Sequence, residues 1–217
     1  MVFNTVEEAY HSQTFAIQLT MTMMMNFGIN FGLEWAAMSQ WGKVQDRGAW
    51  PRISAFGMEP PLKSCLFLDL LLSTFFIGWL CTLFATDGTQ KEVREKKCDM
   101  LVHSAITEGW WKWTPVPIEN VSLRALATGL YVTALVGLPT FLLAWIGIAC
   151  GNNSMNGFAY VWFKGIWATC VSGLVYSFVF PAAISKRNFP ELEFEALMVL
   201  SAGVNSAAPL IAKPALI

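Results

Sequence analysis

Three ionisable side chains stand inside long apolar stretches of this sequence: Glu34, Asp69 and Lys164. A charged group in the middle of a bilayer costs about 2.5 kcal/mol or more, and such groups pair with one another or mark ion pathways. The signs of these three allow Lys164 to compensate one or both carboxylates. The chemistry open to them is therefore an ion pair, a proton or ion relay, or the anchor of a solute pocket.

Two asparagines extend this polar set along the first apolar stretch. At about 100° per residue, Asn26, Asn30 and Glu34 fall within one sector of about 80°, and Gly28 and Gly32 fall roughly opposite. Small residues four apart let another helix approach closely, and amides in lipid need partners. We therefore expect this helix to be contacted on two faces and to lie at the centre of a bundle.

The composition predicts that these apolar stretches lie in a membrane. Of the 217 residues, 55% are hydrophobic and 13% charged, against about 25% charged in soluble domains. The net charge of −1 gives no basic field for nucleic acid. Four windows have the length of about 20 apolar residues that a span needs, at 13–38, 62–85, 124–149 and 158–184. The predicted fold class is all-α, a polytopic four-transmembrane-helix bundle.

Four alternating spans bring the three charges to one depth. Glu34 lies near the end of the first span, whereas Asp69 and Lys164 lie near the starts of the second and fourth. Three readings remain open. The cluster is a functional site, or a structural ion pair that fixes helix register, or a set of separate interfacial residues with Lys164 extended toward the headgroups.

Loop charges predict the orientation. Both termini fall on one side, which carries Lys91, Arg94, Lys96, Lys97, Lys112, Arg124, Lys186 and Arg187. The other side carries Lys43, Arg47, Arg52 and Lys63. The excess of basic residues predicts that the termini face the cytoplasm, matrix or stroma; which membrane is left open.

Stripes of small residues predict close helix contacts in the third and fourth spans. The stripes are Ala125, Gly129, Thr133 and Gly137, and Gly165, Thr169, Gly173 and Ser177. Pro139 and Pro181 should kink or end these helices. Residues 91–109 read either as a basic amphipathic helix on the interface or as a solvated charged loop with one or two helical turns. We expect residues 1–189 to form the membrane domain and 190–217 a tail that docks on the membrane or a partner.

Other chemistry finds little support. No histidine lies within a span, which excludes a bis-histidine haem, and the five cysteines lack metal-ligand spacing. No catalytic set is recognisable, so we expect no enzyme, no metal and no cofactor. A side-chain oxygen of Asn26, Asn30 or Glu34 could ligate the magnesium of a chlorophyll, which leaves a bound pigment or lipid open.

The order of features resembles that of small uncharacterised bacterial four-helix inner-membrane proteins. The resemblance rests on Asn26, Asn30 and Trp35 in the first helix, the basic stretch 91–97, Gly137 with Pro139, Phe163 with Lys164, and Pro181. It covers roughly residues 26–184 and implies four spans but no function. This chain departs from it by its acidic N-terminus, its Trp-rich second loop and its C-terminal tail.

The expected function is that of a structural or accessory subunit of a larger membrane assembly. Its partners would be the lipid bilayer and other membrane subunits, since several helices carry packing stripes. The alternatives are a small ion- or proton-coupled transporter or channel that uses the polar cluster, and a pigment- or lipid-binding scaffold.

Overall fold

The computed structural model describes residues 2–44, 52–53, 66–150 and 155–192, and these are mostly helical. The long helices are α2 (Gln13–Val44), α3 (Leu66–Arg94), α5 (Val121–Val132), α6 (Leu138–Ala149) and α7 (Gly157–Ala183). The π-helical turn η3 (Thr133–Gly137) joins α5 to α6, so that these form one rod. The predicted all-α class is confirmed in that the described residues are mostly helical, with four two-residue strands besides.

Three of these rods are long and apolar enough to cross a membrane: Leu66–Arg94, Val121–Ala149 and Gly157–Ala183. This is compatible with a multi-pass membrane protein. Helix α2, predicted as the first span, is not among them, although its 32 residues are long enough. The difference lies in its polar positions, which include Gln18, Asn26, Asn30 and Glu34.

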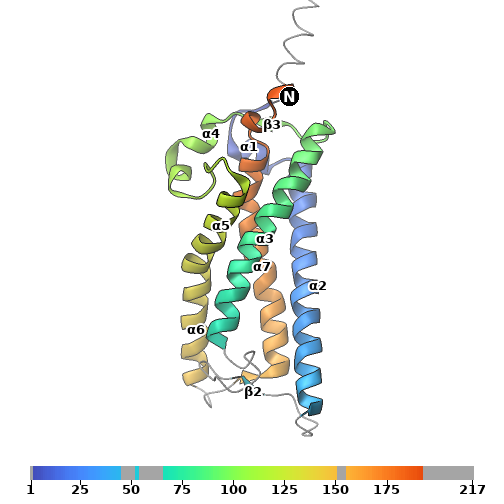
Figure 1. The fold of residues 1–217 in the computed structure, drawn as a ribbon, viewed down its shortest axis with the longest axis vertical. Coiled ribbons are helices and arrows are strands. Elements are labelled where there is room, and N and C mark those ends of the chain that lie inside the picture. Colours follow the sequence, from blue (N-terminus) through green and yellow to red (C-terminus); the bar gives the residue numbers. More distant parts are fainter. Residues whose placement is uncertain (1, 45–51, 54–65, 151–154, 193–217) are drawn as a thin grey trace, which may run out of the picture.

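Helix α7 lies at the centre of the bundle, and successive rods run in opposite directions (Figure 1). It contacts α2 on one side and α3 on another, and α3 in turn contacts α5. The most apolar window of α7 is 67% buried, against 39% for α3 and 22% for the α5–α6 rod. The prediction that the first helix is central is therefore wrong, because α2 lies at the edge of the bundle and packs mainly on α7.

Glycines mark the closest helix contacts, but only some of the predicted ones do so. A Cβ atom on Gly129 or Gly137 would lie within about 3 Å of Phe75 or Thr74 on α3. Gly165 and Gly173 are equally close to aromatic and methionine side chains of α2. These four positions support the predicted contacts.

The prediction that Gly28 and Gly32 mark a close helix contact is wrong. Both are exposed, and a Cβ at either would meet nothing within 4 Å among the described residues. Periodicity gives the face of a helix but not the neighbour, and α7 contacts α2 elsewhere. The tightest crossing involves Gly78, which was not predicted: its Cβ would come 2.8 Å from the Cα of Gly129.

The π-helical turn coincides with the predicted effect of Pro139. A proline cannot donate the usual backbone hydrogen bond, and the π turn is placed immediately before it, in η3. Pro181 lies in the last turn of α7, which ends at Ala183. The two prolines thus distort one rod and stand at the end of the other.

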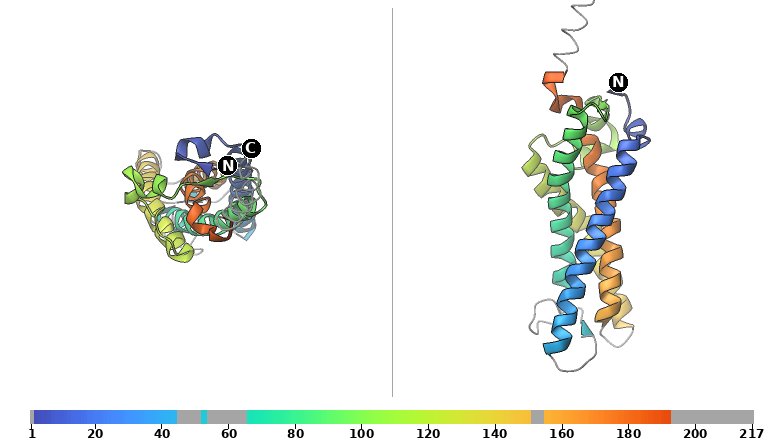
Figure 2. Two further views of the ribbon diagram at one scale, coloured as in Figure 1. Left: turned by 90° about the horizontal axis from the view of Figure 1, so that it is seen from above. Right: turned by 90° about the vertical axis from the view of Figure 1, so that its right-hand side faces the viewer.

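Short elements gather at one end of the bundle (Figure 1; Figure 2). They are β1 (Val2–Phe3), α1 (Val6–Tyr10), β3 (Met100–Leu101), α4 (Ser104–Thr107), η2 (Gly109–Trp113) and η4 (Lys186–Asn188). Strands β1 and β3 pair in parallel, and a second hydrophobic core forms beneath them around Leu101, Tyr176 and Phe180. At the opposite end β2 (Arg52–Ile53) pairs antiparallel with β4 (Met155–Asn156).

The predicted interfacial helix over 91–109 is wrong. Helix α3 ends at Arg94, and Lys96 takes a left-handed conformation with φ of 59°. The amide of Lys96 donates to the Val93 carbonyl and that of Lys97 to the Glu92 carbonyl. This is the Schellman pattern that terminates helices, formed here without the usual glycine. The chain then turns into β3 and α4 instead of continuing as a helix.

The predicted tail falls largely outside the described residues, since the description ends at Leu192. In the short part of the tail that is described, Glu191 pairs with Arg94, with 3.7 Å between Oε1 and Nε. The division into a membrane domain and a docking tail stays a prediction.

Candidate functional site: a buried ion triad

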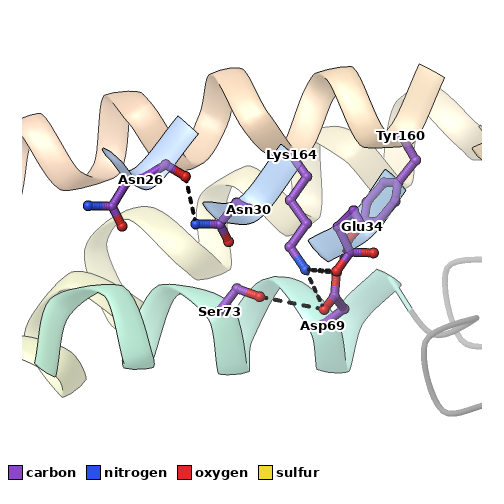
Figure 3. Close-up of polar contacts among 7 residues, drawn as sticks. All are labelled: Asn26, Asn30, Glu34, Asp69, Ser73, Tyr160 and Lys164. Atoms are coloured by element: carbon purple, nitrogen blue, oxygen red, sulfur yellow. Dashed lines mark hydrogen bonds and ion pairs between the residues drawn. The ribbon is translucent and has the colours of Figure 1, made fainter. Parts of the chain in front are cut away.

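The structure brings Glu34, Asp69 and Lys164 together from three helices (Figure 3). Glu34 lies on α2, Asp69 in the first turn of the described α3, and Lys164 on α7. The Lys164 Nζ atom is 2.6 Å from Glu34 Oε1 and 2.7 Å from both carboxylate oxygens of Asp69. We call these three residues the ion triad. It joins the central helix to both of its neighbours.

The triad is almost closed to solvent. The side chains of Lys164, Glu34 and Asp69 are 4%, 6% and 16% exposed. The reading of separate interfacial residues, with Lys164 extended away from the helices, does not fit this geometry. A buried charge is costly unless it is paired, and here the two carboxylates pair with the Lys164 ammonium.

Two further residues hold Asp69 in place and were missed from the sequence. The Tyr160 hydroxyl donates to Asp69 Oδ2, and the Ser73 hydroxyl lies 3.5 Å from Oδ1. Each stands four residues from a triad member on the same helix, which puts it on the same helix face. That spacing is the sequence signal that could have identified them.

The two carboxylates of the triad are unequal. Asp69 is contacted by the ammonium, the phenol and the serine hydroxyl. Glu34 receives only the Lys164 ammonium, and its Oε2 atom is buried with no hydrogen-bond partner among the described residues. With all groups ionised the triad carries one net negative charge. It can therefore fix helix register, and its second carboxylate can take up a proton or a cation.

Asn26 and Asn30 lie outside the triad, along α2. The Asn30 amide donates to the Asn26 carbonyl at 3.0 Å, and the Asn26 amide donates to the Thr22 carbonyl at 3.0 Å and contacts Cys81 Sγ at 3.4 Å. Among the residues that the structure describes, neither side-chain oxygen accepts a hydrogen bond. The prediction that they extend the cluster holds in position but not in direct contact.

These asparagines line a groove of about 500 Å³ between α2 and α3. Its walls are apolar side chains of both helices: Met21, Met25, Ile29, Leu33, Phe76, Ile77, Leu80, Phe84 and Ala85. Its polar positions are Gln18, Thr22, Asn26, Asn30, Ser73 and Cys81. Because Ser73 also contacts Asp69, the groove adjoins the triad. We call it the α2–α3 groove.

In the described part of the chain, no three His, Cys, Asp or Glu side chains are grouped to hold a metal ion. No protein family, no curated protein and no solved structure matches this chain. The functional interpretation therefore rests on the geometry of the triad and the groove.

Proposed function

We propose that the chain is an integral membrane protein with four spans, in which α2 crosses the membrane together with the three apolar rods. An α-helix of 32 residues is about 48 Å long, which exceeds the roughly 30 Å hydrocarbon core. Helix α2 packs on the apolar rod α7, and its buried charge at Glu34 is compensated by Lys164. The excess of basic residues at the end that holds β1 and η4 supports a cytoplasmic, matrix or stromal side for that end.

Within the membrane, we propose that the chain is a structural or accessory subunit of a larger assembly. The observation that carries this proposal is the α2–α3 groove. Its asparagine oxygens accept no hydrogen bond from the described residues, and lipid tails offer no donors. A transmembrane helix of another subunit that carries a donor side chain would fit this groove, and the exposed Gly28 and Gly32 leave α2 accessible beside it.

Site-specific photo-crosslinking in native membranes tests this proposal. A benzophenone amino acid replaces Met25, which lines the groove and is 62% exposed. The matched control replaces Leu143, which is 71% exposed on α6 and lies outside the groove. We expect a protein adduct from position 25 and none from position 143.

The identity of the adducts decides between occupants. A discrete heavier partner at position 25 supports the accessory subunit, and an adduct of twice the chain mass indicates a second copy. Lipid adducts alone at both positions would contradict a partner helix in the groove.

A second candidate, a small proton- or ion-coupled carrier, is favoured by the unequal carboxylates of the triad. Among the described residues, Glu34 has one donor and a buried oxygen without a partner, and intramembrane carboxylates of this kind serve as proton sites. Its position beside the α2–α3 groove would let protonation influence what the groove holds.

Proton flux into proteoliposomes, followed with an entrapped pH-sensitive dye under an imposed membrane potential, tests the carrier. We expect flux in the wild type, loss of flux in Glu34→Gln and no change in Asp87→Asn, an exposed acid on α3. Equal flux in wild type and Glu34→Gln would remove the triad from any transport mechanism.

A further inference from the structure

A buried guanidinium that has no counter-ion among the described residues lies at the other end of the bundle. Arg124, in the first turn of α5, is 4% exposed. Its Nη1 donates to the Ile118 carbonyl at 3.2 Å and its Nη2 to Thr86 Oγ1 at 3.4 Å. Its Nε is buried without a partner, and no carboxylate of the described residues forms an ion pair with it. Within the part of the chain that the structure describes, Arg124 therefore keeps unused donors and an uncompensated charge.

Arg124 lines a pocket of about 200 Å³ beneath the short elements. The polar residues around it include His103, Ser185, Arg187 and Asn188. His103 Nδ1 lies 3.0 Å from Ser185 Oγ, and the Asn188 amide donates to the carbonyls of Ala182 and Ala183. The one acid, Glu119, pairs with Arg187 at 2.7 Å, and both side chains of that pair are more than half exposed. The pocket thus combines a buried cation, unpaired among the described residues, with an exposed ion pair at its rim.

We propose that this pocket binds a phosphate group, either that of a phospholipid headgroup or a free phosphate. A buried charge is costly unless it is paired, and the planar guanidinium matches phosphate oxygens in a bidentate arrangement. Arg124 stands at the start of the apolar rod Val121–Ala149, at the depth where headgroups lie if that rod crosses the bilayer. The inference is independent of the accessory and carrier roles.

Glu119 sets the affinity of the site by competition. Its carboxylate occupies Arg187 and places a negative charge at the rim, where it repels an incoming anion. Replacing it with glutamine frees Arg187 and removes that repulsion without touching a buried group. We expect Glu119→Gln to tighten phosphate binding by up to about fivefold, the scale of one exposed ion pair.

The experiment measures thermal unfolding of the full chain, delipidated in a maltoside detergent that carries no phosphate. Inorganic phosphate is titrated at constant ionic strength in one arm, and phosphatidylglycerol is added in the other. We expect one of the two to raise the Tm of the wild type, more strongly in Glu119→Gln and not at all in Arg124→Gln. Arg94→Gln, an exposed arginine at the same end outside the pocket, should respond like the wild type.

The arms also identify the source of the phosphate. A shift with inorganic phosphate supports a soluble ligand, and a shift with phosphatidylglycerol alone supports a lipid headgroup. Should Arg124→Gln fail to fold, the comparison of Glu119→Gln with Arg94→Gln carries the test. No shift in either arm, or equal shifts in Glu119→Gln, Arg94→Gln and the wild type, would overturn the proposal.

Discussion

The ion triad has two carboxylates and one ammonium group, and this excess of one carboxylate leads to a specific prediction about stability. Removing either carboxylate leaves Lys164 with one anion, whereas removing both leaves a buried cation without any. We therefore expect Glu34→Gln and Asp69→Asn to be tolerated separately and to be strongly destabilising together.

The contacts give the size and order of these effects. At 2.7 Å and an effective dielectric constant of about 20, the gross attraction of one pair is about 6 kcal/mol, most of which offsets desolvation. Glu34→Gln loses little, about 1 kcal/mol or less, because Asp69 keeps its contacts with the lysine and with Tyr160. Asp69→Asn costs more, about 1–3 kcal/mol, since Glu34 meets the lysine through one oxygen. The double variant should lose about 3–5 kcal/mol.

Reversible unfolding in mixed micelles, compared across wild type, both single variants and the double variant, measures this coupling. Asp87→Asn, which removes an exposed carboxylate from α3, the helix of Asp69, serves as the control and should leave the free energy of unfolding unchanged. The double variant should exceed the sum of the singles by at least about 1 kcal/mol. Additivity within about 0.5 kcal/mol would refute the idea that the carboxylates share one cation.

Two further predictions concern packing and thiol reactivity. Gly78→Ala should destabilise the bundle by about 1–3 kcal/mol in the same unfolding assay, because the new methyl group would meet backbone at 2.8 Å. Gly28→Ala, where nothing lies within 4 Å, should be neutral or should stabilise α2 by up to about 1 kcal/mol; equal losses at both positions would contradict the placement of α2. Burial, assisted by the charge of Asp99, raises the pKa of the Cys98 thiol to about 11, so at pH 8 maleimide should label the exposed Cys150 and spare Cys98 until the chain unfolds. Equal labelling rates in the folded protein, read by peptide mass spectrometry, would contradict that burial.

The bounds of two long rods follow from the sequence because they depend on local properties, whereas α2 and α3 extend to Val44 and Arg94, beyond the predicted windows 13–38 and 62–85. The predicted window 124–149 falls within the rod Val121–Ala149, and 158–184 nearly coincides with α7. The failure over 91–109 is also local in origin. Its charges and apolar residues have helical spacing, but the turn at Lys96 uses a left-handed lysine, and residue type gives no sign of that conformation in the absence of glycine.

The triad was accessible from the sequence for a topological reason. Alternating helix directions fix which ends of the helices meet, so Glu34, Asp69 and Lys164 could be placed at one depth before any contact was known. Their distances and their inequality were not accessible. Tyr160 and Ser73 give Asp69 its additional donors, and that depends on how α3 and α7 are rotated about their axes.

What the sequence alone determined is therefore the set of helices and the depth of their charges, because hydropathy and chain alternation act along one dimension. Only the tertiary structure decided which helix is central and which faces meet. A stripe such as Gly28 with Gly32 has the same spacing whether it faces a neighbouring helix or open space, and the crossing of Gly78 over Gly129 became visible only when both helices were in place. The unpaired charge of Arg124 was likewise decided by the tertiary structure. Whether a carboxylate among the described residues lies close to it in space does not follow from which residues stand next to it in the sequence.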